Sequence, residues 1–139
     1  MNYYDEVENY IIDNKITNVV KIYSIRKSEL TTYYNVGKLL VEAEKYYGKA
    51  MEKEYSDMLI KELDNKYNIN HLLEMKKLYL FTKKHPLDIQ LAMSHYRILF
   101  TLSDCNEIDY YINQVKLRRL SARELKNIIK NNEYKNLFK

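Results

Sequence analysis

The chain has 139 residues, a formal net charge of +4 and 46% hydrophobic residues, but two Gly, one Pro and one Cys. This length suits one domain, and the scarcity of Gly and Pro favours helices over hairpins and flexible linkers. The sequence has no internal disulfide, no metal-ligand spacing, no Gly-rich phosphate loop and no apolar run of the roughly 18 to 20 residues that cross a bilayer.

Apolar residues recur at spacings of three and four from residue 16 to about residue 47, which predicts one long amphipathic helix or two in series. Gly37 lies in the middle of this segment, where it costs about 0.5 to 1 kcal/mol relative to Ala. We expect another helix to approach closely there.

Two shorter helices are predicted at residues 54–67 and 70–84. Only Asn68, Ile69 and Asn70 separate their apolar stripes, and Asn70 can cap the second helix. This pattern is typical of a helix-turn-helix, although any helical hairpin has a similar one. Pro86 ends the second helix, so residues 85–92 are predicted to be a loop or a very short β wing.

Three further helices are predicted at residues 94–102, 104–120 and 122–132. Asp104 with Glu107, and Ser121 with Glu124, match the capping box that marks a helix start. The expected fold is therefore mostly α, a helical bundle that contains a helix-turn-helix or winged-helix-like unit. We expect one domain over residues 16–139, preceded by an extension of residues 1–15.

The positive charge is concentrated at the C-terminal end. Residues 115–139 hold eight Lys or Arg and two acids, whereas residues 1–114 hold fifteen Lys or Arg and seventeen acids. Arg123, Lys126 and Lys130 share one face of the last predicted helix, and Lys116, Arg118 and Arg119 extend the patch toward the preceding one. Such a surface can neutralise phosphates with a salt-dependent affinity, and an ordinary solvated helix face is the alternative.

If residues 54–84 form a helix-turn-helix, the side chains best placed to reach base edges are Asn70, Glu74 and Lys77, with His71 near the helix start. Glu74 is unfavourable beside a phosphate backbone unless it accepts a hydrogen bond from cytosine or is neutralised by Lys77.

Two short motifs resemble catalytic sites, and we interpret neither as one. Ser94 and His95 are adjacent, so on a helix their side chains diverge by about 100° and cannot form a nucleophile and base pair. We expect Ser94 to be a helix cap and His95 or Tyr96 to make a structural hydrogen bond. The Glu74-Met75-Lys76 tripeptide matches an E-x-K nuclease fragment, but it lies in a helical segment without the strand partner that metal binding requires. No catalytic residue is expected.

Four sequence blocks resemble, in order and spacing, the N-terminal domain of the YhcG-type family, bacterial proteins in which this helical domain precedes a PDDEXK-type nuclease domain. The blocks are YYNVGKLLVEAE from residue 33, NHLLEMKKLY from residue 70, SHYR from residue 94 and SAREL from residue 121. The resemblance runs from about residue 16 to the C-terminus. It implies a DNA-binding helical module without its nuclease, in which the block that contains Arg97 is structural or positions the DNA-facing surface.

The expected function is therefore that of a non-catalytic DNA-binding or targeting module in the cytoplasm. Its expected partners are duplex DNA and a separate nuclease subunit, without a cofactor, metal or membrane. The alternative is a phage or mobile-element protein that binds a host defence protein and inhibits or recruits it, which the absent nuclease and the composition rich in Lys, Asn, Ile and Tyr favour. Self-association into a homodimer through the long N-terminal helix is compatible with either function.

Overall fold

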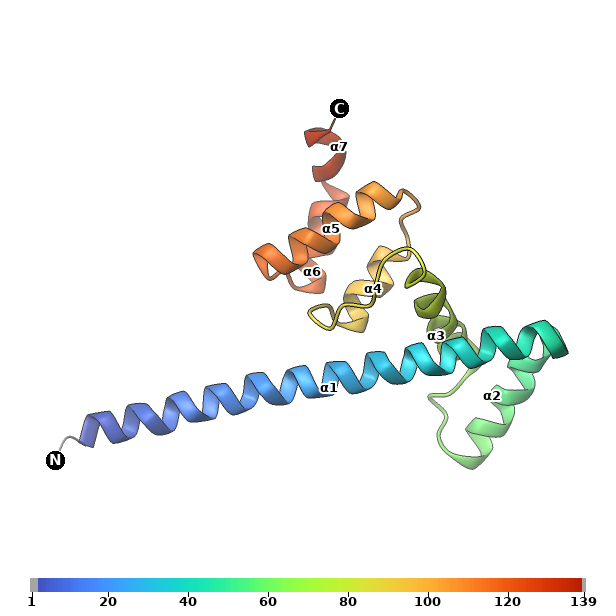
Figure 1. Cartoon of the computed structure of the whole chain (residues 1–139), viewed down its shortest axis with the longest axis horizontal. Helices are drawn as coiled ribbons and strands as arrows, with labels where there is room; N and C mark the ends of the chain where they lie inside the picture. The colour runs from blue at the N-terminus through green and yellow to red at the C-terminus, as the bar shows by residue number, and fades with distance from the viewer. Residues whose placement is uncertain (1–2, 139) are drawn as a thin grey trace.

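The structure, a computed structural model, describes residues 3–138, which form helices and loops without a strand (Figure 1). The all-α prediction is therefore confirmed. The helices are α1 (Tyr3–Tyr47), α2 (Ala50–Glu62), α3 (Ile69–Phe81), α4 (Met93–Leu99), α5 (Cys105–Arg118), α6 (Ala122–Lys130) and α7 (Glu133–Leu137).

Helix α1 is a single unbroken helix of 45 residues, the first of the two arrangements predicted for its segment. It continues through residues 15 and 16, so the structure shows no break where the N-terminal extension was expected to end. Its C-terminal half packs against α2 and α3, whereas residues 3–25, which we call the arm, are exposed throughout, and the N-terminal part of the arm extends beyond the other helices (Figure 1).

The crossing of α1 and α3 is close because Gly37 has no side chain. A Cβ atom at this position would overlap the carbonyl oxygen of Met75 on α3 and would touch the Cβ atom of Tyr79. The predicted close approach of another helix at Gly37 is thus confirmed. Leu30, Tyr33 and Leu40 of α1 are buried along the same contact.

An ion cluster joins α1, α2 and α3 beside this crossing. The Lys76 ammonium of α3 lies 2.5 Å from Glu44 of α1 and also binds Glu52 of α2, whose side chain is buried. Burial by itself lowers the pKa of Lys76, but the hydrogen bonds to the two carboxylates outweigh burial and raise that pKa above its usual value. Lys76 therefore stays charged and holds the three helices together.

Residues 82–92, between α3 and α4, form a packed loop and not the β wing considered from the sequence. Leu91 is fully buried, and the Tyr96 hydroxyl binds both backbone groups of Asp88 by accepting from its N–H at 2.8 Å and donating to its carbonyl at 3.2 Å. Helix α3 ends at Phe81, with Thr82 as its C-cap residue, so Pro86 lies in the loop and does not itself end the helix as predicted. The chain after Pro86 follows the core and does not project from it.

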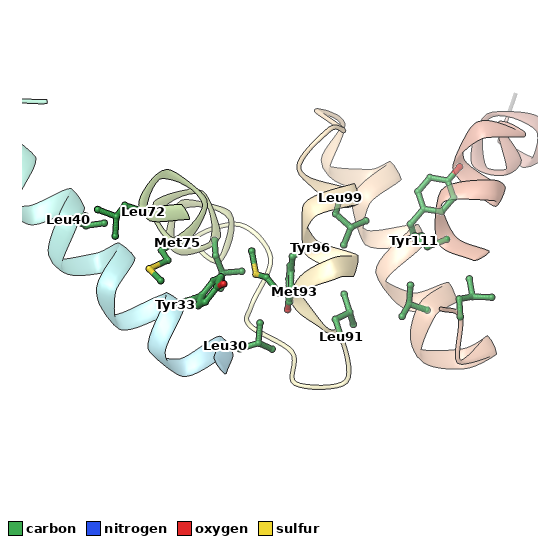
Figure 2. Close-up of a cluster of buried hydrophobic side chains, with 14 of the residues drawn as sticks. Leu30, Tyr33, Leu40, Leu72, Met75, Leu91, Met93, Tyr96, Leu99 and Tyr111 are labelled. Atoms are coloured by element: carbon green, nitrogen blue, oxygen red, sulfur yellow. The ribbon is translucent and has the colours of Figure 1, made fainter. Parts of the chain in front are cut away.

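One continuous core connects the α1–α3 region to the C-terminal helices (Figure 2). It extends from Leu40 and Leu72, through Met93 and Tyr96 at the start of α4, to Tyr111 of α5 and Leu125 of α6. The position of the C-terminal helices is therefore set through side chains that pack outward from the α1–α3 crossing.

Several helix ends differ from the prediction because different residues cap them. Asn68, and not Asn70, caps α3 by accepting from the backbone N–H of His71 at 3.1 Å. Asp104 caps α5 through the N–H of Asn106, not that of Glu107. The short helix α7 was not predicted.

Replacing Gly37 with Ala is expected to destabilise the protein by about 1 to 3 kcal/mol, because the α1 and α3 backbones must separate to admit the methyl group. Thermal unfolding followed by circular dichroism measures the change. Lys38→Ala, one residue along and exposed, is the matched control and should leave the unfolding temperature nearly unchanged. Equal unfolding temperatures for the two variants would contradict the close crossing.

Candidate nucleic-acid interface

Helices α5 and α6 are joined by a tight turn of three residues, Arg119, Leu120 and Ser121. The Ser121 hydroxyl accepts from the backbone N–H of Glu124, and the Glu124 carboxylate accepts from the backbone N–H of Ser121, each at 3.1 Å. The capping box predicted at these two residues is confirmed. Its hydrogen bonds lower the pKa of Glu124, so this carboxylate is committed to the start of α6.

Arg119 ends α5 in the left-handed backbone region, with φ 50° and ψ 50°. This conformation is uncommon for residues other than Gly and costs about 1 kcal/mol or more. Its backbone N–H binds the carbonyl of Val115, which fixes the sharp change of direction into α6. The turn therefore holds an exposed Arg directly before the helix.

His95 connects the start of α4 to this turn. Its Nδ1 accepts from the backbone N–H of Ala92 at 2.9 Å, so its Nε2 carries the proton and donates to the Leu120 carbonyl at 2.8 Å. Burial lowers the pKa of His95, with a further lowering from Arg26, although the bond to Leu120 acts in the opposite direction. The expected structural hydrogen bond of His95 is confirmed, whereas the cap position of α4 is Ala92 and not Ser94.

The two sides of α6 differ sharply in character. Leu125 is completely buried, and Ile128 and Ile129 pack beside it against the core. Arg123, Lys126 and Lys130 lie on the exposed side, and none of them forms an ion pair with any residue between positions 3 and 138. Asn127, four residues after Arg123, is exposed on the same side. We call the four side chains Arg123, Lys126, Asn127 and Lys130 the α6 face.

Three other cations of the predicted site are neutralised by acidic neighbours. Lys116 lies 2.8 Å from Asp88, and Arg118 lies 3.0 Å from Glu133. Arg97 of α4 binds Glu74 of α3. These ion pairs connect segments far apart in sequence, so these cations contribute to packing and less to an open positive surface.

The predicted site residues of α3 lie on a different surface from the α6 face. Asn70 and Lys77 are exposed, but they flank Glu74. His71 is partly buried, and its Nε2 lies 2.9 Å from the Tyr33 hydroxyl. Residues 63–68, a longer connection than expected, separate α2 from α3, and α3 packs across α1 (Figure 1). The α3 surface thus presents one unpaired cation, Lys77, where α6 presents three.

Neither Asn127 nor the geometry of the α5–α6 pair was predicted from the sequence. The signals for both were present, because Ser121 and Glu124 fix the start of α6 and Asn127 follows Arg123 by one helical turn. The short spacing at residues 68–70 favoured a helix-turn-helix of α2 and α3 instead.

The other motifs considered in the sequence can also be located in the described chain. Between residues 3 and 138, no three His, Cys, Asp or Glu side chains gather where they could hold a metal ion. The Glu74-Met75-Lys76 tripeptide is helical, as predicted, and its charged members bind Arg97 and the two α1 and α2 carboxylates. None of the helices in this range has both the length and the apolar content that spanning a bilayer requires.

The lowered pKa of His95 predicts a loss of stability in mild acid. The unfolded chain takes up a proton near pH 6.5 while the folded chain resists it, so the stabilisation is complete above pH 6.5 and is lost as the pH falls through the folded-state pKa. We expect the denaturant midpoint to fall between pH 7.5 and pH 5.5, and to fall less in His95→Gln. His71→Gln, which retains His95, is the control and should keep the wild-type dependence. The same pH dependence in His95→Gln and wild type would contradict a neutral, structural His95.

The comparison with known families identifies the chain. The family described as DUF1016 N-terminal domain matches residues 6–136, which include most of α1 and all of α2 to α6. Neither the curated proteins nor the solved structures gave a match to this sequence. Because the family match covers nearly the entire chain, this protein belongs to the DUF1016 N-terminal domain family.

Proposed function

We propose that this protein is a non-catalytic module that binds duplex DNA through the α6 face. The observation that carries the proposal is the set of three unpaired cations on one side of a helix whose other side is fixed in the core. A helix that follows its partner after a three-residue turn, with its polar side outward, has the arrangement that helix-turn-helix proteins use to place a helix in the major groove.

The dimensions and charge of α6 suit this role. Its nine residues span about 13 Å, similar to the roughly 12 Å width of the major groove. Arg123, Lys126 and Lys130 can contact phosphates, while Asn127 is of the type that pairs with the edge of adenine. Arg119 adds a fourth cation next to the start of the helix. We infer that phosphate contacts supply most of the affinity.

The paired and unpaired cations of the predicted patch are expected to have different roles. Lys116 and Arg118 already contact acids, so moving them to a phosphate would first break an existing ion pair. Asn70 and Lys77 on α3 would contribute at most a secondary contact, since Lys77 is the one unpaired cation that α3 presents within the described chain. We therefore expect α6, and not α3, to make the main contact with DNA.

The resemblance to YhcG-type proteins suggests what such binding would serve. In that arrangement the helical domain directs a nuclease to DNA, and we infer that this chain has the same positioning role. The chain's own contribution is to hold DNA without cutting it.

Reversing the charge of the α6 face tests the proposal. With about four phosphate contacts, the affinity of the wild-type protein for a short duplex should fall about 100-fold between 50 and 200 mM salt. At 50 mM salt, the combined change Arg123→Glu, Lys126→Glu and Lys130→Glu should weaken binding at least about 30-fold. Fluorescence anisotropy with a labelled duplex measures both effects.

A control variant carries the same change in net charge on α1 and α2. It combines Lys38→Glu, Lys45→Glu and Lys53→Glu, all at exposed positions without an ion pair inside the described chain. Its affinity should stay within about threefold of wild type at 50 mM salt. Equal losses in the two triple variants, or no binding by wild type at 50 mM salt, would overturn the proposal.

Arg119 allows binding to be separated from stability. Arg119→Gly removes one cation and also relieves the left-handed backbone, so we expect it to stabilise the protein by about 1 kcal/mol while reducing the salt dependence of DNA binding by about one phosphate contact. Chemical denaturation and anisotropy titrations at several salt concentrations measure the two effects. A variant that is less stable than wild type would show that the Arg119 side chain has a structural role.

A further inference from the structure

The arm carries a broad apolar face that nothing in the described chain covers. Its members are 43–57% exposed and fall on one side of the helix when residues are placed at 100° intervals. They are Val7, Ile11, Ile12, Ile16, Val19, Ile22, Tyr23 and Ile25. An exposed apolar surface of this length on one helix marks an interaction site.

This face continues the seam by which α1 packs in the core. Leu30, Tyr33, Gly37 and Leu40 are buried at alternating spacings of three and four residues, and Ile12, Ile16, Val19 and Tyr23 extend the same spacing toward the N-terminus. That spacing is the one that places two paired helices side by side. The chain therefore contains a helix-pairing seam of which α3 covers only the C-terminal part.

The chain's own C-terminal helices do not cover the arm. Val19 and Tyr23 face the α5–α6 turn across a cleft of about 480 Å³, whose walls also include Arg26, Lys116 and Arg119. Charged walls of this kind do not bury an apolar helix face. A partner from outside the described chain is needed.

The distribution of charge on the arm identifies that partner. Residues 3–14 contain four acids and no Lys or Arg, whereas residues 15–25, the rest of the arm, contain two Lys and no acid. Two arms lying antiparallel would place the acidic part of each against the basic part of the other, while parallel arms would place like charges together. We propose that the arm pairs antiparallel with the arm of a second copy of this chain, with the two-fold axis near the border between Asn14 and Lys15.

The size of the face agrees with this pairing. The half-exposed apolar side chains offer on the order of 700 Å² per copy, close to the roughly 800 Å² that each partner contributes to a standard interface. The arm is also about 34 Å long and rich in Ile, Val and Asn, which are modest helix formers, and helices in proteins gain most of their stability from packing against a partner. Pairing gives each arm the packing that an isolated helix lacks, and a two-fold symmetric contact closes at two copies.

Light scattering coupled to size exclusion tests the stoichiometry with the full chain. We expect a mass of twice 16.9 kDa for wild type and of one chain for the combined change Ile12→Glu and Val19→Glu. The control is Thr17→Glu with Ser24→Glu, which adds the same charge on the opposite side of the arm and should remain dimeric. A monomeric wild type at about 100 µM, or a dimer that survives the first pair of changes, would overturn the proposal.

Disulfide formation tests the orientation and does not depend on a destabilising change. With Cys105 replaced by Ser, the proposed axis places Val7 of one copy near Ile22 of the other. A mixture of Val7→Cys and Ile22→Cys proteins should therefore form a mixed disulfide, and each protein alone should not form a disulfide with itself. Disulfides within the separate samples and no mixed disulfide in the mixture would show parallel arms and overturn the proposal.

Discussion

The close crossing of α1 and α3 at Gly37 is the contact on which the rest of the structure depends. Without a side chain on Gly37, the α3 backbone reaches α1 directly, which brings Lys76 within reach of Glu44 and Glu52. The same crossing places α3 so that the core can continue through the start of α4 to α5 and α6. The final link is His95, which binds the turn that precedes α6. The orientation of the α6 face is thus transmitted from a contact on the opposite side of the core.

The cations of this protein fall into two groups with different roles. Lys76, Arg97 and Lys116 bind carboxylates on other segments, where their charges fix one element against another. The cations of the α6 face have no such partners in the described chain, because the acid nearest in sequence, Glu124, is committed to the Ser121 backbone. Net charge alone does not distinguish these groups. The distinction depends on which acids the fold brings within reach of each cation.

The sequence predicted the features that depend on local spacing and missed those that depend on distant contacts. Apolar periodicity predicted α1 from residue 16 onward, Gly37 indicated a close crossing, and Ser121 with Glu124 marked the start of α6. By contrast, the ion pair of Lys116 with Asp88 joins residues that only the folded loop brings together, and no local pattern encodes it. The turn between α2 and α3 was misjudged for a related reason. Asn68 proved to be the cap. The buried side chains of α3 pack against α1, and the sequence of either helix alone does not show which helix is its partner.

Because α1 runs without a break from the arm to the crossing, the number of residues between them determines which way the arm faces. Deleting one residue between Ile25 and Leu30 would rotate the arm by about 100° about the helix axis relative to Gly37, whereas removing seven would rotate it by about 20°. Insertions or deletions in this stretch therefore preserve the direction of the arm only when they amount to nearly a whole number of helical turns. An evolutionary constraint of this kind acts on residue count and not on residue identity, so it would leave individual positions free to vary while their number stays fixed.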